Sequence, residues 1–280
     1  MNGKTCMVTG ANAGIGKATA LGLAKMGATV VMVCRSRERG ELALAEITRE
    51  SGNDSVFLLL ADLSSQTAIR NLVADFTATY PRLHVLINNA GIIPKRRTVT
   101  EDGLETQLAV NHLAYFLLTN LLLDKLKASA PARILNVSSQ AHQGASLDFD
   151  DLQSERSYRP THVYAWTKLA NVLFTYELAR RLEAIHVTAN CLHPGAVATK
   201  LLADYMPSVL RFMAKIFGIT PENGAQTSLY LAGSPEVEGV SGKYFVKQKS
   251  VPSSKASYDR TAARRLWEVS AKLTGLPIPN

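Results

Sequence analysis

The sequence predicts a single-domain α/β protein, built on a doubly wound, mainly parallel sheet of seven strands with helices on both faces. Short apolar or β-branched runs alternate with longer segments whose apolar residues recur at helical spacing, which is typical of βαβ units. The 280 residues, of which 46% are hydrophobic, can bury one large core. No linker or repeat beyond this alternation interrupts the chain, so one domain over residues 1–280 is expected.

Each expected element corresponds to one of these runs. The predicted strands are residues 5–9, 28–33, 56–60, 85–88, 133–138, 186–190 and 242–246. The predicted helices are residues 16–26, 37–50, 66–79, 104–127, 163–183 and 262–273. Because crossover connections in such a sheet are right-handed, a ligand is expected beyond the carboxyl ends of the strands.

Charge and composition exclude several functional classes. The formal net charge is +8, but the basic residues form small scattered groups with no basic-aromatic stripe, so nucleic acid is not an expected partner. Cys6, Cys34 and Cys191 stand in apolar runs and are interpreted as reduced core thiols. The six histidines show no metal-ligand spacing, and no catalytic metal is expected.

The predicted location of the protein rests on two features, the N-terminal sequence and the length of the apolar runs. Residues 4–9 enter directly into a strand pattern, without the features of a secretory signal. The most apolar run, residues 113–123, contains Asn120 and is followed by Asp124 and Lys125, so it is too short to span a bilayer. A cytoplasmic protein without a transmembrane segment is the expectation.

A glycine-rich loop joins the first predicted strand to the first predicted helix. Glycines lack a Cβ, so such a loop can turn sharply and approach a pyrophosphate that faces the helix N-terminus. Without this strand–helix context, a glycine triplet could be a tight turn only. We therefore predict a Rossmann-type dinucleotide site formed by Gly10, Asn12, Ala13, Gly14, Ile15 and Gly16.

Arginines rather than a carboxylate follow the second predicted strand. An acidic residue there usually binds the ribose 2′-hydroxyl of NAD, whereas this chain reads Val-Cys-Arg-Ser-Arg over residues 33–37. The guanidinium of Arg35 suits a 2′-phosphate, with Arg37 as the second candidate. NADP(H) is therefore the expected cofactor. The alternative is that both arginines are solvated residues at a helix start.

Tyr164 and Lys168 are spaced four residues apart in a predicted helix, which places the phenol and the ammonium on one face. A nearby cation is expected to lower the pKa of the phenol toward neutrality, where a general acid or base works best. Such a pair is common on helices, so spacing alone is weak evidence for catalysis.

Further motifs stand in sheet order around this pair. They are Asn-Asn-Ala-Gly at 88–91 after the fourth predicted strand, Asn111 in the following helix, Ser138-Ser139 after the fifth strand and Pro194-Gly195 after the sixth. With these residues in view, the sequence resembles the short-chain dehydrogenase/reductase family over essentially the whole chain. The local sequences at residues 136–142, 193–195 and 242–245 are most similar to those of the retinol dehydrogenase branch, which also favours NADP(H).

The resemblance implies roles for individual residues. Ser139 would bind and polarise the substrate oxygen, Tyr164 would exchange the proton, and Lys168 would hold the ribose and activate Tyr164. Asn111 would fix a relay water. The resemblance also implies that Asp62 and Leu63 flank the adenine, that Asn88, Ala90 and Gly91 line the cofactor trench, and that Val197 and Thr199, after Pro194 and Gly195, hold the nicotinamide carboxamide.

Two departures from the family pattern accompany the match. Thr167 stands where the family often has serine, which keeps a hydroxyl. The interval from Ser139 to Tyr164 is longer than the commonest one and leaves residues 143–162 as an extra loop. Ser138 therefore remains an alternative to Ser139 as the catalytic serine.

An apolar, methionine-containing stretch after Thr199 suggests the kind of substrate. Residues 199–220 are predicted to form a lid beside the nicotinamide, which favours a lipophilic carbonyl or alcohol. The same stretch could instead touch a membrane surface or a partner chain. The expected activity is NADP(H)-dependent interconversion of an apolar aldehyde or ketone and its alcohol, and the alternative is a non-catalytic NADP(H)-sensing or scaffold protein. A homo-oligomer through the long helices stays open.

Overall fold

The computed structural model describes residues 1–183, 185–195 and 220–277. These residues form an eight-stranded sheet in the order β3-β2-β1-β4-β5-β6-β7-β8, parallel except for the last pair. The strands are β1 (Thr5–Thr9), β2 (Thr29–Cys34), β3 (Val56–Leu60), β4 (Val85–Asn88), β5 (Ala132–Val137), β6 (Val187–His193), β7 (Tyr244–Val246) and β8 (Lys249–Val251). The strand order reverses between β3-β2-β1 and β4-β5-β6, as a doubly wound fold requires.

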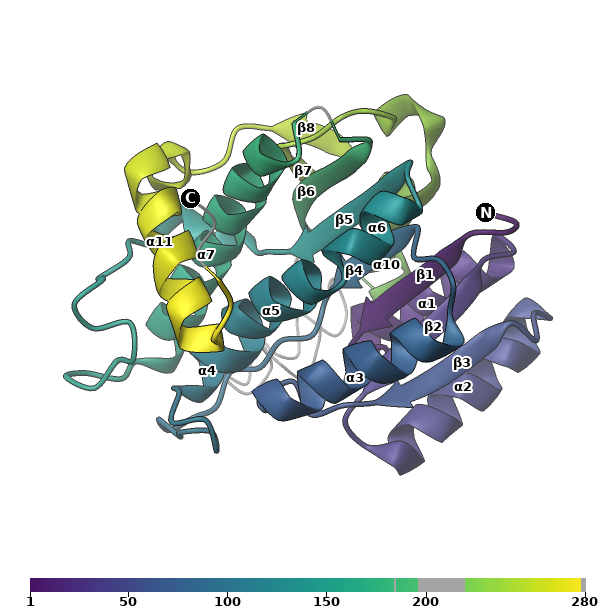
Figure 1. The fold of residues 1–280 in the computed structure, drawn as a ribbon, viewed down its shortest axis with the longest axis horizontal. Helices are drawn as coiled ribbons and strands as arrows, with labels where there is room; N and C mark the ends of the chain where they lie inside the picture. The colour runs from purple at the N-terminus through teal and green to yellow at the C-terminus, as the bar shows by residue number, and fades with distance from the viewer. Residues whose placement is uncertain (184, 196–219, 278–280) are drawn as a thin grey trace.

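Helices cover both faces of the sheet (Figure 1). The helices are α1 (Gly14–Lys25), α2 (Arg37–Ser51), α3 (Gln66–Thr79), α4 (Thr106–Leu108), α5 (Ala114–Leu121), α6 (Leu123–Ala128), α7 (Pro160–Arg181), α10 (Pro221–Gly233) and α11 (Arg260–Thr274). Shorter turns are the π-helical η1 (Ala109–Leu113) and the 3-10 turns η2 (Gln140–Gly144), η3 (Pro235–Val237) and η4 (Lys255–Tyr258).

Side-chain alternation along the buried strands divides the core into two main layers. Met7 of β1 packs with residues of α3, α5 and α7, while its neighbours Cys6 and Val8 pack with residues of α1, α2 and α10. Successive residues of a strand point to opposite faces, so a central strand needs apolar residues at every position. The run Cys-Met-Val over residues 6–8 meets that need.

The C-terminal helix α11 packs against α7 and α5, on the face of the sheet that α3, α5 and α7 cover. The Trp267 ring lies 5.0 Å from the Phe116 ring and 5.7 Å from the Phe174 ring, and the Arg181 guanidinium lies 4.2 Å from its centre. These contacts cover part of the long helices that the sequence offered for oligomer formation. Figure 1 shows α11, in yellow, lying across α7 and the end of α5.

The sheet has eight strands where the sequence predicted seven. β8 returns from β7 through a two-residue turn, because Val246 is paired with Lys249. The turn residues Lys247 and Gln248 both have positive φ values, 49° and 63°. Such turns are usually recognised by Asn-Gly or Asp-Gly, and Lys-Gln carries no such signal. The extra strand therefore escaped the sequence pattern.

Two helix expectations also needed correction. The single helix predicted over residues 104–127 is divided into α4, η1, α5 and α6, and the wider turn η1 centres on Asn111, whose backbone and side chain bond to other elements. Helix α10 was not predicted, although Thr220, Pro221 and Glu222 form a recognisable helix start, with the Thr220 hydroxyl accepting from Asn223 N–H.

Candidate active site

The glycine-rich loop between β1 and α1 has a backbone path that requires glycine. Gly10 and Gly14 have φ values of 68° and 55°, in the left-handed region. A Cβ on Gly16 would lie 2.3 Å from the Gly10 carbonyl oxygen and 2.5 Å from the Asn89 side-chain nitrogen. The loop is therefore folded tightly on itself with no side chain between its turns.

The first turn of α1 has no side-chain cap. Ala13 occupies the N-cap position without a side-chain cap, and no acidic residue stands in the first turn. Unsatisfied N–H groups and the helix dipole together favour an anion. A side-chain-free loop leading into an uncapped helix fits the pyrophosphate of a dinucleotide, with Asn12 and Ile15 partly exposed on the same loop.

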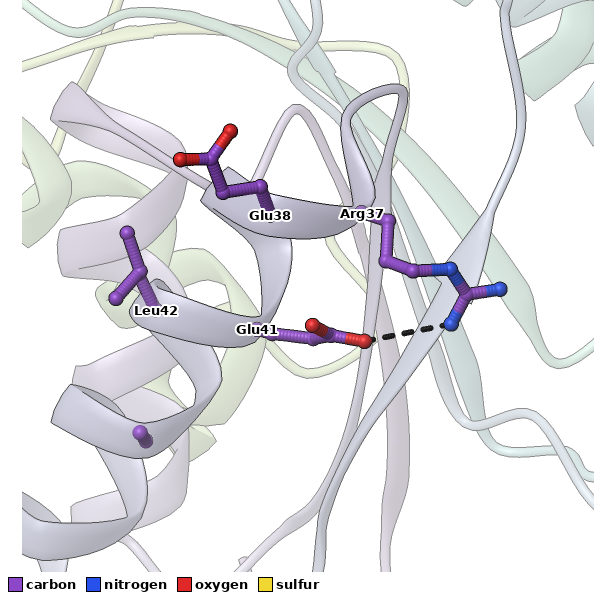
Figure 2. A pocket seen from close by; sticks show the side chains of 5 residues that line it. Arg37, Glu38, Glu41 and Leu42 are labelled. Carbon is purple, nitrogen blue, oxygen red and sulfur yellow. Dashed lines mark hydrogen bonds and ion pairs between the residues drawn. The ribbon is translucent and has the colours of Figure 1, made fainter.

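The arginines after β2 differ in their contacts. The exposed Arg37 guanidinium pairs with Glu41 at 3.3 Å, beside a surface pocket that Glu38, Leu42 and Ala45 help to line (Figure 2). The Arg35 guanidinium lies 3.8 Å from the Asp62 carboxylate and is 67% exposed. Asp62 also accepts from the Ser64 backbone and hydroxyl, whereas Leu63 is buried in the core. Arg35 and Asp62 thus lie together at this edge of the sheet.

The segment after β4 connects the glycine loop to the centre of the site. The Asn89 side chain donates to the Thr9 carbonyl at 2.8 Å, and its backbone N–H donates to the Thr9 hydroxyl at 2.8 Å. Ala90 accepts from the Tyr115 hydroxyl at 2.8 Å. Asn89 and Tyr115 were missing from the sequence expectation, although Asn89 belongs to the same Asn-Asn-Ala-Gly motif.

The Asn88 side chain lies in the core beneath the predicted cofactor trench. It is fully buried and donates to the Asn136 side chain at 2.8 Å and to the Thr119 hydroxyl at 2.9 Å. These bonds join β4 to β5 and α5 inside the core. The Asn88 side chain therefore supports the sheet beneath the site, and Ala90 and Gly91 lie nearer the reactive residues.

Tyr164 and Lys168 lie on one face of α7, as their spacing predicts. Both are buried, and the Lys168 ammonium donates to the Val137 carbonyl, at the end of β5, at 2.9 Å. The ammonium nitrogen lies 5.5 Å from the ring centres of both Tyr164 and Tyr115. The lysine is therefore held between two tyrosine rings and a strand end, and no ion pair reaches it from residues 1–183, 185–195 or 220–277.

The direction of the Tyr164 pKa differs from the sequence expectation. Burial raises the pKa of the phenol to about 12, and hydrogen bonding with the Ser139 side chain offsets part of the rise. Burial also lowers the pKa of Lys168 from 10.5 to about 7. The expected lowering of the Tyr164 pKa toward neutrality is thus wrong for the protein alone, because desolvation disfavours both charged forms.

The two serines after β5 have distinct partners. The Ser138 hydroxyl is buried and donates to the Lys168 carbonyl at 2.8 Å, which ties β5 to α7. Ser139 is partly exposed, its hydroxyl accepts from Ala141 N–H at 3.2 Å, and its side chain offsets part of the rise in the Tyr164 pKa. Of the two, Ser139 is the serine that influences the pKa of the Tyr164 phenol, and the Ser138 hydroxyl is already used in the core.

Asn111 lies beside this group, in η1. Its side chain accepts from Ile92 N–H at 2.8 Å and donates to the Ile92 carbonyl at 3.0 Å. A Cβ built on Gly91 would lie 3.4 Å from the Asn111 side-chain oxygen and 3.6 Å from the Lys168 nitrogen. Gly91 therefore lies within ordinary contact distance of both the asparagine and the lysine, and the segment after β4 packs against them.

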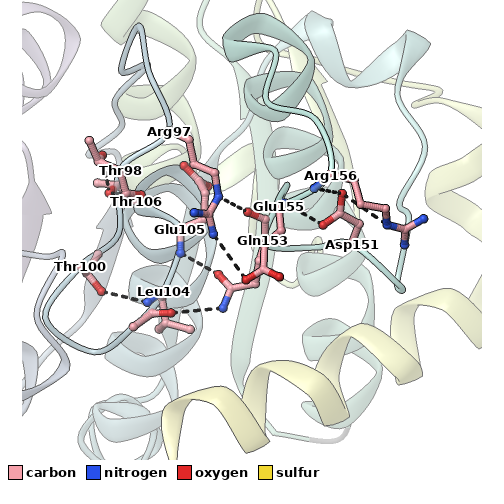
Figure 3. A network of polar contacts seen from close by, with 11 residues as sticks. Arg97, Thr98, Thr100, Leu104, Glu105, Thr106, Asp151, Gln153, Glu155 and Arg156 are labelled. Carbon is pink, nitrogen blue, oxygen red and sulfur yellow. Dashed lines mark hydrogen bonds and ion pairs between the residues drawn. The ribbon is translucent and has the colours of Figure 1, made fainter.

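The extra loop before α7 is bonded to residues 94–107 (Figure 3). The Arg97 side chain donates to the Gln153 carbonyl at 2.9 Å, and Glu105 N–H donates to the Gln153 side chain at 2.7 Å. Gln107 donates to the Tyr158 hydroxyl at 2.9 Å, and its own side-chain oxygen lies 3.4 Å from the Asn111 amide nitrogen. The loop thereby connects to the site through Gln107, which the sequence patterns did not single out.

The end of β6 leads toward residues that the structure leaves out. Pro194 follows His193, and Gly195 has a φ of 94°, a conformation that suits glycine. Val197 and Thr199 lie outside the described residues, as does the predicted lid over 199–220 except Thr220. In the described ranges, no helix is long and apolar enough to cross a membrane.

The motifs thus meet at the carboxyl ends of β1, β4 and β5, and residues 4–208 match the family model for short chain dehydrogenase. The chain belongs to the short-chain dehydrogenase family. It is similar to human retinol dehydrogenase 14, with 46% identity over 99% of this chain and 88% of the relative. Human retinol dehydrogenase 13 is 47% identical over 99% and 86%. The chain is therefore retinol dehydrogenase-like, an oxidoreductase of this family.

Solved structures agree with this assignment. An uncharacterized protein from Mycobacterium paratuberculosis matches with a TM-score of 0.80 and 32% identity, covering 100% of this chain and 96% of that one. The NADP active-site complex of RhlG from Pseudomonas aeruginosa matches with a TM-score of 0.70 and 27% identity, covering 88% and 94%. The family therefore includes structural neighbours with a bound nicotinamide dinucleotide.

Proposed function

We propose that this short-chain dehydrogenase uses NADP(H) to interconvert an apolar, retinoid-like aldehyde or ketone and its alcohol. The observation that carries the proposal is the position of Tyr164 on the same face of α7 as the buried Lys168, whose nitrogen lies 5.5 Å from the phenol ring, with Ser139 influencing the phenol pKa. A phenol and a second hydroxyl can together hold one carbonyl oxygen, one as proton donor and one as a hydrogen-bond partner.

The roles follow from these positions. Ser139 binds and polarises the substrate oxygen, and Tyr164, protonated at neutral pH because burial raises its pKa, gives its proton to the alkoxide that forms. Lys168, on the same face of α7 and bonded to the Val137 carbonyl at the end of β5, supports Tyr164. The nicotinamide supplies or accepts the hydride when bound. Asn111, next to Gly91, is the fourth residue of the proposed catalytic group, with Ser139, Tyr164 and Lys168.

Residues for the cofactor are proposed along the same edge of the sheet. The glycine loop and the start of α1 bind the pyrophosphate, Asp62 lies by the adenosine, and Ala90 and Gly91 line the trench. The full proposed set is Gly10, Asn12, Ala13, Gly14, Ile15, Gly16, Arg35, Arg37, Asp62, Leu63, Asn88, Ala90, Gly91, Tyr164, Lys168, Pro194, Gly195, Val197 and Thr199. Leu63 and Asn88 contribute through the backbone, since their side chains are buried.

NADP(H) is proposed over NAD(H) because of Arg35. No carboxylate stands in residues 33–37, and Arg35 is exposed, with Asp62 at 3.8 Å as its one ion-pair partner within the described residues. A 2′-phosphate offers a stronger, bidentate partner than this carboxylate. Arg37 contributes less, because it already pairs with Glu41.

The substrate class rests on the relatives and on residues 199–220. The relatives are named retinol dehydrogenases, and this stretch of the chain is apolar and contains methionines that adapt to a greasy ligand. We assign it as a lid over the substrate rather than as a contact with a membrane surface.

The test follows NADPH oxidation with retinal, medium-chain aldehydes and steroid ketones. Tyr164→Phe is expected to lower kcat by about 10²–10⁴-fold, since it removes the general acid. Tyr176→Phe, on the same helix, is the matched control, because its hydroxyl bonds to Ser253 away from the site. Undiminished turnover in the Tyr164 variant would exclude this mechanism.

Cofactor preference is tested separately, by the affinities for NADPH and NADH. Arg35→Ala is expected to weaken NADPH binding about 10-fold or more relative to NADH, since a charge-assisted hydrogen bond contributes about 1.5–3 kcal/mol. Arg37→Ala is the comparison, with a smaller change in the ratio. An unchanged ratio in the Arg35 variant would remove this residue from cofactor selection.

A further inference from the structure

The main-chain carbonyl of Asn111 has a partner on another element. The Asn171 side chain, one turn beyond Lys168 on α7, donates to this carbonyl at 2.8 Å. Asn171 and Asn111 are both fully buried. A side-chain amide of this kind fixes the carbonyl in position, because an unpaired buried carbonyl would cost more than the bond itself contributes.

Asn171 is in turn held by a chain of two more side chains. Its amide oxygen lies 3.2 Å from the His112 Nδ1, and the His112 Nε2 lies 2.9 Å from the Ser270 hydroxyl. His112 is fully buried and Ser270 is 1% exposed. Ser270 belongs to α11, so the chain runs from the C-terminal helix through η1 and α7 to the Asn111 backbone.

The donor and acceptor at each step are set by the last bond. Because only the NH₂ of Asn171 can donate to a carbonyl, its oxygen faces His112, which must therefore donate from Nδ1. Burial lowers the pKa of His112 to about 4, so the ring is neutral and Nε2 accepts from the Ser270 hydroxyl. All three bonds then point in the same direction, an arrangement in which each strengthens the next.

This chain acts on the segment of the site that is least regular. η1 is a π-helical turn, a form that is rare and often found at functional sites. On its other side, the Asn111 side chain is held by Ile92, Gln107 and Thr167. Hydrogen bonds thus fix Asn111 through its side chain on one side and through its main-chain carbonyl on the other. Its side-chain oxygen lies 3.4 Å from the position of a Cβ built on Gly91.

We propose that Asn171, His112 and Ser270 are positioning residues, which transmit the placement of α11 to Asn111 and so set the geometry of the catalytic group. The inference rests on the proposed function for its effect on turnover. These three hydrogen-bonded side chains contribute no atom to the reaction. They determine where the Asn111 carbonyl and side chain lie relative to Lys168 and Tyr164.

Two variants and one control test the proposal in the full-length protein. Asn171→Leu keeps the side-chain size and removes the donor, and Ser270→Ala removes the far end of the chain. Thr274→Val is the control, because the Thr274 hydroxyl is also buried on α11 but donates to the Ser270 carbonyl, outside the chain. Ser270→Ala and Thr274→Val each remove one buried hydroxyl donor, so they are expected to lower thermal stability by similar amounts, whereas Asn171→Leu removes two buried hydrogen bonds and is expected to lower it more.

The kinetic readout separates positioning from stability. Asn171→Leu is expected to lower kcat with retinal about 10-fold or more with KM nearly unchanged, since a displacement of about 1 Å can cost about 10²-fold. Ser270→Ala is expected to cause a smaller decrease, and Thr274→Val none. Wild-type kcat in both chain variants, or an equal decrease in Thr274→Val, would overturn the proposal.

A second readout does not depend on activity. Backbone hydrogen exchange over residues 109–116 is expected to quicken in Asn171→Leu and Ser270→Ala but not in Thr274→Val. If the wild-type protein turns over no carbonyl, the proposed function fails, and this exchange still decides whether the chain restrains η1. Unchanged exchange in both chain variants would overturn the inference on structural grounds.

Discussion

Binding of NADP⁺ is expected to take up nearly one proton per chain at pH 8, through Lys168. Burial lowers the pKa of this ammonium to about 7 in the protein alone, so about a tenth of it is charged at pH 8. An anionic dinucleotide beside Lys168 favours the charged form and raises its pKa. If the pKa returns toward its ordinary value, uptake approaches ~0.9 proton, and affinity decreases up to about tenfold per pH unit above 7.

The assay is titration calorimetry in two buffers of different ionisation enthalpy at pH 8, which counts protons directly. Lys168→Met removes the titrating group and is expected to abolish the uptake and the pH dependence of affinity. Tyr164→Phe controls for the phenol, whose pKa of about 12 makes it a possible source of released protons. Wild-type uptake near zero, or equal uptake in Lys168→Met, would refute the assignment of Lys168 to the cofactor site.

Three further predictions concern the scaffold. Gly16→Ala is expected to abolish dinucleotide binding, because its Cβ would lie 2.3 Å from the Gly10 carbonyl, whereas Gly144→Ala, with nothing within 4 Å, should bind normally; calorimetry compares them. Trp267→Ala should lower the free energy of unfolding by about 3–5 kcal/mol in urea titrations, by emptying the space between α11 and α5. Burial lowers the pKa of His112 from 6.5, its ordinary value, to about 4 in the folded protein. The folded state therefore resists protonation of the ring, and the free energy of unfolding should decrease by up to ~3 kcal/mol as the pH decreases from 6.5 to 4. The stability difference between wild type and His112→Asn, measured at pH 7 and pH 4.5, should shrink accordingly; a constant difference would contradict this.

Local sequence signals predicted most of the scaffold. β1, β3, β4 and α3 begin and end at the expected residues, since all three strands are short apolar runs and Ser65 caps α3 in the usual way. The turn between β7 and β8 was missed because Lys247 and Gln248 adopt positive φ without the usual turn residues.

The sequence by itself determined the glycine loop, the Tyr164–Lys168 spacing and the order of the motifs along the chain, because each depends on neighbours a few residues apart. Only the tertiary structure decided that the Ser138 hydroxyl bonds to the Lys168 carbonyl while Ser139 influences the phenol, and that the Asn88 side chain faces the core. It also decided the π-helical turn at Asn111 and the pKa directions of Tyr164 and Lys168. These properties depend on burial and on partners such as Asn171 and Ser270, which are distant in the sequence and come together only when the helices pack.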